Sequence, residues 1–340
     1  MAKVTMQDIA DALNISRVTV WKVFNNHSGV SDDLRMQIIN KAKELGYTKW
    51  KPTEYIENNI IAERTVSVIV SRPESAVFWT SIIHQLAKEL TTFNVNLMYT
   101  YVPSSYSEGY SLPNILSNGT VQGVVVLNIY DSKMIRLINQ LTLPKVFLDN
   151  VPEVYNEELS GDVILLEGYS STKKITNFII HKGRTDIGFI GDIRYAQTNL
   201  DRYNGFLAAM KENDLIVSPN NCLIRSLGIY SYYEEMCHFL DKLEKMPSAF
   251  VCVSDYVAHF LYKYLCERGY HVPGDVAISG YDGSPEYTAI KNIITTVNVQ
   301  TSDLGRRLAR QILYRIDFPD VSHELTYISS EIVFRETTDF

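Results

Sequence analysis

A short run of side chains near the start of the sequence has the types and spacing to bind nucleic acid. Arg17, Val18, Trp21 and Lys22 fall on one face of a predicted helix over residues 17–24. A long basic side chain near the start of a short helix suits a major groove about 12 Å wide. The chemistry indicated is hydrogen bonding to base edges and phosphates. An amphipathic helix pair with a purely structural role would show the same pattern.

A second pair of residues has the spacing of an enzyme's active site. Tyr169 and Lys173 share one helix face, as does the catalytic pair of short-chain dehydrogenases. Such an enzyme also needs a GxGxxG loop after an early strand, and neither Gly188 nor Gly191 supplies one. The sequence has no HExxH, GxSxG or GxxxxGK[ST] motif either. We therefore expect no enzyme activity, no cofactor and no metal, with a short-chain-dehydrogenase-like enzyme as a remote alternative.

Three short helices must position the side chains of the first set. Thr5 is the expected N-cap of the first helix, and Ser16 that of the second. Asn14 can adopt the left-handed conformation that the turn between them needs. Ser31 begins a third helix, which stops at Gly46. The apolar stripes of the three helices predict one small core, made of Ile9, Val20, Val23, Ile38 and Leu45.

A series of residues between Val4 and Tyr47 makes this segment more specific. The series comprises Asp8-Ile9-Ala10, Ser16, Thr19-Val20, Val23, Asn25, Val30-Ser31, Arg35 and Glu44-Leu45-Gly46-Tyr47. In order and spacing it resembles the headpiece of the lac/gal repressor family of bacterial transcription regulators. The resemblance implies that the second helix lies in the major groove of operator DNA and that a following hinge helix enters the minor groove. The implied DNA-contacting or fold-holding residues are Thr5, Ser16, Arg17, Val18, Thr19, Trp21, Lys22, Asn25, Ser31 and Ile56.

The segment departs from the family pattern at three places. Trp21 stands where the family usually has a small serine, and Lys22 where it usually has arginine. Because lysine cannot make arginine's bidentate contact with guanine, we expect a different operator sequence at the bases that Lys22 reads. In the hinge, Ile56 falls at the position of the apolar wedge that kinks DNA, but two nearby glutamates are poor neighbours for phosphates. A plain linker is therefore the alternative for the hinge.

Length and charge agree with a small head on a larger body. A chain of 340 residues predicts two or three domains, and a hydrophobic fraction of 46% is enough for sizeable cores. Residues 1–52 hold eight Lys/Arg and five Asp/Glu, a net charge of +3. Because the whole chain carries −7, the remainder carries −10. This division puts the affinity for nucleic acid in the head.

The sequence indicates a cytoplasmic protein with no membrane segment. Its N-terminus is polar, and no apolar run approaches the about 18 residues that a membrane span needs. The four cysteines have no CxxC spacing, so we expect reduced thiols rather than disulfides or a zinc site.

From about Arg64 onward, strand-like and helix-like patterns alternate. Residues 65–70 form a β-branched run of the kind found in strands buried on both faces. Two such series predict two doubly wound parallel sheets, with ligands at the carboxyl ends of the strands and between the lobes. The expected strands are 65–70, 96–101, 123–127 and 145–148 in the first series, and 162–166, 186–190, 222–224, 249–253 and 276–279 in the second. The expected helices are 78–91, 110–116, 131–140, 170–181, 199–212, 230–243 and 255–268.

Motifs in the body extend the resemblance over essentially the whole chain. They include Asp201-Arg202-Tyr203-Asn204-Gly205-Phe206, the stretches 249–255 and 276–282, and Phe334-Arg335-Glu336-Thr337-Thr338. The resemblance implies an α/β body of two periplasmic-binding-protein-like lobes, which the chain crosses near Ser160, Asn292 and Asp320. The implied parts are an all-α helix-turn-helix headpiece (1–47), a hinge (48–62), a first lobe (63–160 plus 292–320) and a second lobe (161–291 plus 321–340).

The resemblance also implies an effector site between the lobes. An arginine and carboxylates suit sugar hydroxyls, which need paired donors and acceptors, and an aromatic ring at the start of a helix can stack on a pyranose. Each carboxylate alone could equally be a helix cap or a surface charge. The implied effector-binding residues are Phe78, Trp79, Asp149, Arg202, Asp255 and Asp282.

The function implied is that of a transcription regulator, most simply a repressor of carbohydrate-use genes. A homodimer would bind a pseudo-palindromic operator through two heads, and an effector would change the angle between the lobes. Where the family often has Asp-Asn, this chain has Glu167-Gly168, so the identity of the effector stays open. The alternatives are a regulator that responds to a phosphoprotein or purine co-repressor, and a constitutive DNA binder that has lost its ligand.

Overall fold

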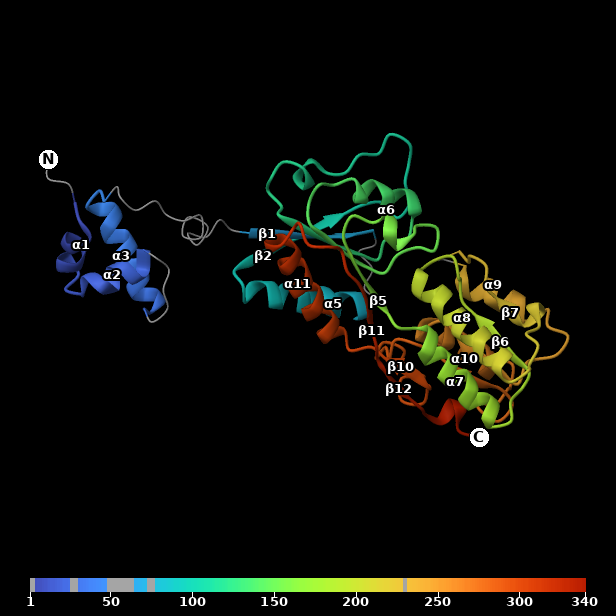
Figure 1. Cartoon of the computed structure of the whole chain (residues 1–340). Coiled ribbons are helices and arrows are strands. Elements are labelled where there is room, and N and C mark those ends of the chain that lie inside the picture. Colours follow the sequence, from blue (N-terminus) through green and yellow to red (C-terminus); the bar gives the residue numbers. More distant parts are fainter. Residues whose placement is uncertain (1–3, 25–29, 48–63, 72–76, 229–230) are drawn as a thin grey trace. The chain divides into compact units, whose positions relative to one another are not determined.

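The structure is a computed structural model that describes residues 4–24, 30–47, 64–71, 77–228 and 231–340. The chain divides into two compact units, Met1–Ala62 and Glu63–Phe340, which we call the head and the body (Figure 1). Each unit is described by itself. Two of the expected DNA-contacting residues, Asn25 and Ile56, lie outside the described residues, as does the whole of the expected hinge, 48–62.

The head consists of three helices, α1 (Met6–Ala12), α2 (Arg17–Phe24) and α3 (Asp32–Glu44). The predicted core is confirmed in most of its members, because four of the five predicted residues are fully buried and Leu45 packs at the margin. The core also contains Ala10, Phe24, Ile39 and Ala42.

The ends of the head's helices form as predicted. Thr5 Oγ1 accepts a hydrogen bond from the Asp8 amide, and the Asp8 carboxylate accepts one from the Thr5 amide at 2.7 Å. Ser16 Oγ caps α2 by accepting a hydrogen bond from the Thr19 amide at 3.0 Å. Asn14 has a φ of 53° and Gly46 a φ of 70°, which are the left-handed conformations that these turns require.

The body contains a six-stranded parallel sheet in the order β11-β5-β4-β3-β1-β2. With its helices we call it the first lobe. Its strands are β1 (Arg64–Val70), β2 (Val95–Tyr101), β3 (Gly123–Leu127), β4 (Lys145–Leu148), β5 (Asp162–Leu166) and β11 (Leu325–Ile328). Its helices are α5 (Val77–Thr91), α6 (Ser132–Asn139) and α11 (Thr301–Asp317), with short 3-10 turns at η1 (Asn114–Leu116) and η2 (Asn156–Glu158).

Alternate side chains of β1 enter two different cores, as expected of a strand buried on both faces. Val66, Val68 and Val70 pack in the core that contains Ile82 and Leu86 of α5. Ile69 points the other way, into the core that α6 covers. Figure 1 shows α5 and α11 side by side, in agreement with their many mutual contacts.

A second parallel sheet, in the order β7-β6-β8-β9, belongs to the second lobe. Its strands are β6 (Ile187–Ile190), β7 (Cys222–Leu223), β8 (Ala249–Cys252) and β9 (Ala277–Ser279). Its helices are α7 (Tyr169–His181), α8 (Gln197–Glu212), α9 (Tyr232–Leu240) and α10 (Asp255–Glu267), with 3-10 turns at η3 (Pro219–Asn221) and η4 (Glu336–Thr338). The antiparallel pair β10 (Thr296–Asn298) and β12 (Glu331–Val333) adjoins this sheet through bridges from Ser279 to Thr295 and from Asp282 to Asn298. The predicted fold class, an all-α headpiece with an α/β body of two parallel sheets, is confirmed.

Two strands, β5 and β11, lie in the first lobe although we expected them in the second. Residues 162–166 were expected to open the second sheet, but β5 pairs with β4 and β11 in the first. The chain therefore changes lobe after β5, before α11, and between β11 and β12, rather than near Ser160, Asn292 and Asp320. The physical reason is at the start of β5, where Asp162 forms a buried ion pair with Arg315 of α11. That pair ties β5 to the first lobe.

One predicted helix is wrong. Residues 110–116 form an irregular segment that ends in the single turn η1, because Pro113 immediately precedes that turn and supplies no amide donor. Within the described part of the chain, none of the helices combines the length and the apolarity that crossing a bilayer requires.

Candidate functional site

The recognition helix of the head presents the residues that the sequence placed on its surface. Arg17 is exposed and Lys22 is half-buried, and the apolar Val18 and Trp21 keep 61% and 45% of their surface exposed. Thr5, Ser16 and Ser31 are also exposed, whereas Thr19 is half-buried and bonds to Ser16. Two cations therefore flank an apolar pair on one short helix, an arrangement that can contact phosphates, base edges and thymine methyl groups.

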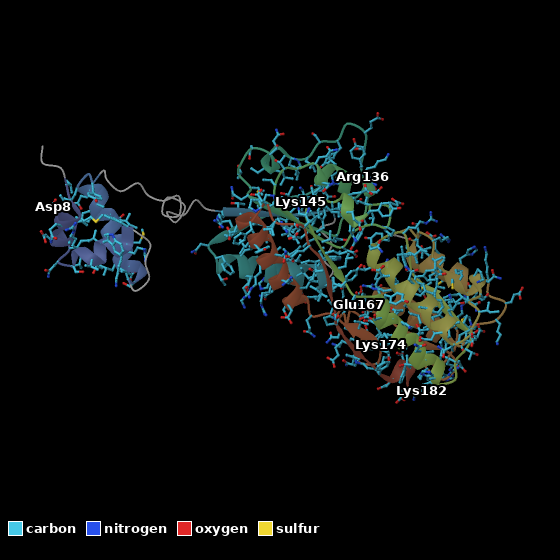
Figure 2. The ribbon with its side chains drawn as sticks, in the orientation of Figure 1. Asp8, Arg136, Lys145, Glu167, Lys174 and Lys182 are labelled. Carbon is cyan, nitrogen blue, oxygen red and sulfur yellow. The ribbon has the colours of Figure 1, made fainter. Side chains whose placement is uncertain are left out.

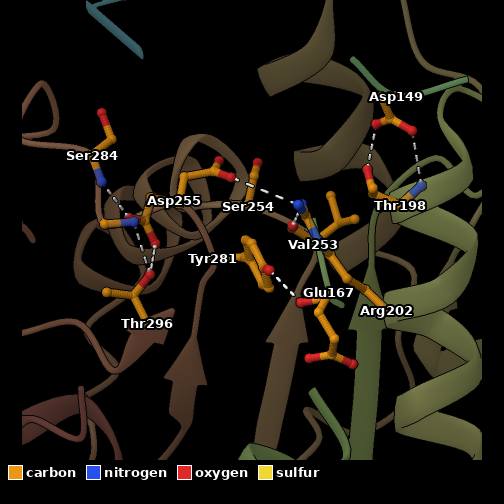
Figure 3. Close-up of polar contacts among 12 residues, drawn as sticks. Asp149, Glu167, Thr198, Arg202, Val253, Ser254, Asp255, Tyr281, Ser284 and Thr296 are labelled. Carbon is orange, nitrogen blue, oxygen red and sulfur yellow. Dashed lines mark hydrogen bonds and ion pairs between the residues drawn. The ribbon is translucent and has the colours of Figure 1, made fainter. Parts of the chain in front are cut away.

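Arg202 is the centre of a polar cluster in the second lobe (Figure 3). It lies on α8, is 5% exposed, and donates a hydrogen bond from Nη1 to the Val253 carbonyl at 2.6 Å. Its guanidinium lies 3.6 Å from the centre of the Tyr281 ring, and its Nη2 lies 3.8 Å from Asp282 Oδ1. The buried Nε has no hydrogen-bond partner within the described residues. A buried donor without a partner is costly, and a ligand that accepts a hydrogen bond would remove that cost.

Asp282 follows β9 in a strained conformation. Its φ of 110° is rare for a residue with a side chain. Burial raises the pKa of its carboxyl from 3.8 to about 7, although the Arg202 charge acts in the opposite direction. The side chain still keeps 23% of its surface exposed, so a ligand can reach it. Backbone strain and a raised pKa at one accessible carboxylate are typical of a binding site.

Asp255 lies at the start of α10 and holds the neighbouring loop in place. Its Oδ1 accepts a hydrogen bond from Thr296 Oγ1 at 2.7 Å, and its Oδ2 accepts one from the Ser284 amide at 2.8 Å. Burial raises its pKa to about 6. The cap of α10 is the preceding residue, Ser254, rather than Asp255. Because both carboxylate oxygens are occupied, Asp255 fixes the loop that carries Asp282.

Asp149 joins the two lobes. It follows β4 of the first lobe with a φ of 69°, and its Oδ2 accepts a hydrogen bond from Thr198 Oγ1 of α8 at 2.5 Å. The Asn150 carbonyl accepts a second bond, from the Gln197 amide, at 2.7 Å. The Thr198 amide also donates to Asp149 Oδ1, at 3.3 Å, so two orphan amides at the positive end of α8 are used, one helical turn before Arg202. The contact between the lobes and the Arg202 cluster therefore share one helix.

The topology explains why these residues meet. In each sheet the strand order reverses beside the first strand of the series, between β1 and β3 in the first lobe and between β6 and β8 in the second. Ligands in such sheets bind at the carboxyl ends of the strands on either side of that reversal. Val253, whose carbonyl accepts from Arg202, directly follows β8. The sequence could place residues at strand ends but could not show which strands are neighbours.

Phe78 and Trp79 are not brought into this cluster by any bond that the structure describes. Their rings meet edge to face at 5.2 Å, and both pack against the core of the body. The preceding residue does touch the other lobe, because the Val77 amide donates to Glu286 Oε2 at 3.3 Å. The start of α5 is thus close to the second lobe, as the prediction required, and a stacking role for the two rings stays a prediction.

Glu167 and Gly168, where the family pattern differs, have a structural role. The Glu167 carboxylate accepts hydrogen bonds from Ser170 and Ser171 at the start of α7, and its carbonyl accepts one from the Tyr281 hydroxyl at 2.5 Å. Figure 2 shows Glu167 near the junction of the lobes, with Lys174 further along α7. Glu167 therefore supports the ring on which Arg202 lies.

The alternative enzyme pair has no supporting geometry. Lys173 makes an ion pair with Glu212 of α8 at 3.0 Å, and Tyr169 is 44% exposed. Within the described residues, no group of three or more His, Cys, Asp or Glu side chains is placed to hold a metal ion.

Sequence reasoning missed several neighbours of the cluster. Tyr281 lies between Asp282 and a glycine in a motif we had noted, but its place under Arg202 depends on the fold of the loop. Tyr130 and Tyr195 also meet across the lobes, with ring centroids 4.2 Å apart. Their position in the chain could have indicated them, because Tyr130 follows β3 and Tyr195 follows β6. Each of these strands lies next to a reversal of strand order.

Comparison with known proteins agrees with this two-part architecture. A family model described as bacterial regulatory proteins of the lacI family matches residues 5–49, and one for a periplasmic binding protein-like domain matches residues 176–338. The chain is 25% identical to the transcriptional regulator RegA of Clostridium saccharobutylicum, over 98% of this chain and 99% of that protein. It is 26% identical to the transcriptional repressor PurR of Histophilus somni (strain 129Pt), over 98% of each chain.

Solved structures share the fold over the whole length. The transcriptional regulator CelR in complex with cellobiose matches with a TM-score of 0.69 and 21% identity, over 98% of this chain and 100% of that one. The Lac repressor dimer bound to operator and the anti-inducer ONPF matches with a TM-score of 0.67 and 17% identity, over 99% of both chains.

A helix-turn-helix head joined to a two-lobed ligand-binding body defines a class of proteins, the DNA-binding transcriptional regulators. Within that class, residues 5–49 belong to the lacI family of bacterial regulatory proteins and residues 176–338 to the periplasmic binding protein-like domains. The expectation that it is not an enzyme is confirmed by its relatives, which are regulators.

Proposed function

We propose that this regulator is a dimeric repressor of carbohydrate-use genes, released from its operator when a sugar-like effector binds between the lobes. The observation that carries the proposal is the buried Arg202, whose Nε has no partner while Asp282 stays accessible beside it. Together they offer a donor and an acceptor to vicinal hydroxyls, over an aromatic ring. The cellobiose complex of CelR and a ribose-bound LacI-family regulator from Enterococcus faecium support a sugar as the ligand class.

On the DNA side, the proposal assigns base reading to α2. Arg17, Val18 and Lys22 face base edges, while the hydroxyls of Thr5, Ser16, Thr19 and Ser31 contact phosphates or hold the fold. We assign Trp21 to the same interface because its large ring is exposed in the middle of the helix. Asn25 and the Ile56 wedge complete the proposed set.

The proposed parts keep the sequence limits for the head (1–47) and the hinge (48–62). For the lobes we adopt the strand pairing as the boundary, because an effector can rotate only parts that pack as separate sheets. The Asp149–Thr198 contact is then one of the bonds whose geometry depends on the angle between the lobes. We also propose a cytoplasmic location, where operator DNA and reduced cysteines are both found.

The test is a comparison of Arg202→Ala with Arg194→Ala, which removes an exposed arginine of the same lobe. Operator DNA is first selected from a random-sequence pool by the wild-type protein. We expect a panel of mono- and disaccharides to include one that raises the melting temperature of the wild type and of Arg194→Ala, by mass action, and releases both from DNA. Arg202→Ala should bind the operator but show neither response.

Two outcomes would change the proposal. An Arg202→Ala protein that responds to the same sugar as the wild type would show that the site lies elsewhere. The sequence left one other candidate open, a purine co-repressor that strengthens operator binding. Hypoxanthine and guanine therefore belong in the panel, and a response to them alone would replace the sugar with a purine co-repressor.

A further inference from the structure

A cavity of about 160 Å³ lies beside the Arg202 cluster. The proposed function gives none of its lining residues a role. It is lined by Ser71, Ser104, Ser105, Tyr130, Asp131 and Tyr195. We propose that this cavity binds a second, uncharged, polyhydroxylated ring, so that the effector is a saccharide of at least two units. The inference rests on the proposed function, because it places the first unit at Arg202 and Asp282.

The cavity lies where a doubly wound sheet is expected to bind a ligand. Ser71 directly follows β1 and Tyr130 follows β3, the two strands on either side of the reversal in strand order. The register pairs Val70 with Leu127, so the carboxyl ends of the two strands are level. Ser71 Oγ donates to the Asn128 carbonyl, which holds the two ends together. The site is therefore built from the framework of the sheet and not from a loop alone.

The lining selects for a neutral ligand. The Asp131 carboxylate is used as a cap, since Oδ1 accepts from the Met134 amide at 2.8 Å and Oδ2 accepts from the Tyr106 amide at 3.3 Å. Lysine and arginine are missing from the lining residues, so nothing there would neutralise a phosphate or a carboxylate. Serine hydroxyls can both donate and accept, as sugar hydroxyls do. The accessible lining is almost wholly polar, so its hydroxyl and carbonyl groups would contact the sugar through hydrogen bonds.

The size of the cavity matches one ring rather than a whole drug-sized ligand. Pockets for such ligands have volumes of about 300–1,000 Å³, well above the about 160 Å³ of this cavity. A water molecule needs only about 30 Å³ of liquid volume, so the cavity exceeds what a structural water requires. A single pyranose or furanose ring is the natural intermediate size.

Tyr130 connects this cavity with the cluster around Arg202. Its strand pairs with β4 at Leu127 and Leu148, which brings Tyr130 and Asp149 to the same edge of the sheet. The pKa of the Tyr130 hydroxyl is raised by burial and further by the charges of Asp149 and Asp282, so it lies within electrostatic reach of both carboxylates. On its other side the ring meets Tyr195 of the second lobe, 4.2 Å away between centroids. A two-unit ligand would therefore contact both lobes at both of its rings.

The test is a set of affinity measurements on the full-length protein with disaccharides and their constituent monosaccharides. The probes are cellobiose, maltose, lactose and sucrose, each compared with glucose, galactose or fructose, by calorimetric titration. We expect one disaccharide to bind at least about tenfold more tightly than its constituents. Ser105→Tyr and Ser104→Tyr place a ring in the cavity from an exposed position, and should bring the affinity for the disaccharide to that for the monosaccharide. Ser107→Tyr, on the same exposed loop but outside the lining, should keep the tenfold ratio.

Three results would overturn the inference. Equal affinity of wild type for a monosaccharide and for every disaccharide that contains it would remove the second unit but leave the proposed function intact. A disaccharide advantage that survives in both tyrosine variants would put the second ring elsewhere. If none of the sugars binds while the operator is still bound, the proposed function and the inference fail together.

Discussion

Asp282 combines a half-buried carboxyl group with a left-handed backbone conformation. Both features cost stability, and both are typical of a binding site. Burial raises the pKa to about 7, above the ordinary 3.8, because the charged form loses its hydration. A raised carboxyl pKa stabilises the folded state most fully below pH 3.8, and this contribution is lost as the pH rises through about 7.

An Asp282→Asn variant tests this pH dependence. The amide is neutral at every pH, so the melting temperature of the variant relative to the wild type should increase between pH about 4 and about 7 and then stay constant. Thermal melts at four pH values would measure it. As a control, Asp320→Asn changes an exposed aspartate and should follow the wild type at each pH. A difference for Asp282→Asn that does not change with pH would mean that its carboxyl is ionised throughout.

Lys22 is the residue for which the proposal makes a specific prediction about DNA affinity. If it reads a base, Lys22→Ala should weaken binding to the selected operator by about 1–3 kcal/mol and binding to random DNA by less. Anisotropy titrations with both DNAs would give the two losses. Lys41→Ala, on α3 and paired with Glu44 at 2.7 Å, is the matched change of charge and should reduce both affinities little and equally. Equal losses for Lys22→Ala on both DNAs would make Lys22 a phosphate contact.

The close packing of helices α5 and α11 depends on one glycine, Gly305 of α11. A Cβ at Gly305 would lie 2.6 Å from the Ile82 carbonyl oxygen and 3.0 Å from the Leu86 amide nitrogen, both in the backbone of α5. We expect Gly305→Ala to lower the free energy of unfolding, because an overpacking cost of about 1–3 kcal/mol exceeds the about 1 kcal/mol gained in helix propensity. Urea unfolding would measure the loss. Ser302→Ala, an exposed change on the same helix, should stay within about 0.5 kcal/mol of wild type, and an unchanged Gly305→Ala would show that the two helices can separate freely.

The helices and strands show which parts of the fold the sequence could predict and which it could not. Helix caps at Thr5 and Ser16 depend on neighbours three residues away, and the sequence predicted both. The membership of β5 depends on Asp162 meeting Arg315, a contact 153 residues apart, which no local pattern reveals. The predicted helix at 110–116 failed for a local reason that was visible, since Pro113 lies inside it.

The candidate site divides in the same way. Arg202 and Asp282 were found because the family resemblance fixes their positions, and the structure brings them within 3.8 Å. Ser71, Tyr130 and Tyr195 were missed because their common feature is the end of a strand beside a reversal of strand order, and the order of strands is a property of the sheet. A search of residues directly after each predicted strand would have included Ser71.

For the whole molecule, the basic head and acidic body imply a specific division of labour. Residues 1–52 carry +3 and the rest −10, so the body contributes repulsion rather than attraction to DNA. An effector in the body can then act on DNA binding only by changing the relation of two heads in a dimer. In thermodynamic terms this is a coupling between two sites, and it must be reciprocal.

Reciprocity predicts how operator DNA affects the affinity for the sugar, whatever conformational change connects the two sites. If the sugar weakens operator binding by a given factor, in a range of about 5–150-fold, saturating operator must weaken sugar binding by the same factor. We expect Thr198→Val, which removes the 2.5 Å bond to Asp149 between the lobes, to change both factors together, because one equilibrium between lobe angles determines both. Titrations of sugar with and without operator, and of operator with and without sugar, would give the two numbers for each protein. A sugar whose own affinity is insensitive to DNA cannot release the operator by binding to this protein, because reciprocity holds for any pair of sites; that result would exclude sugar binding to the regulator as the cause of release.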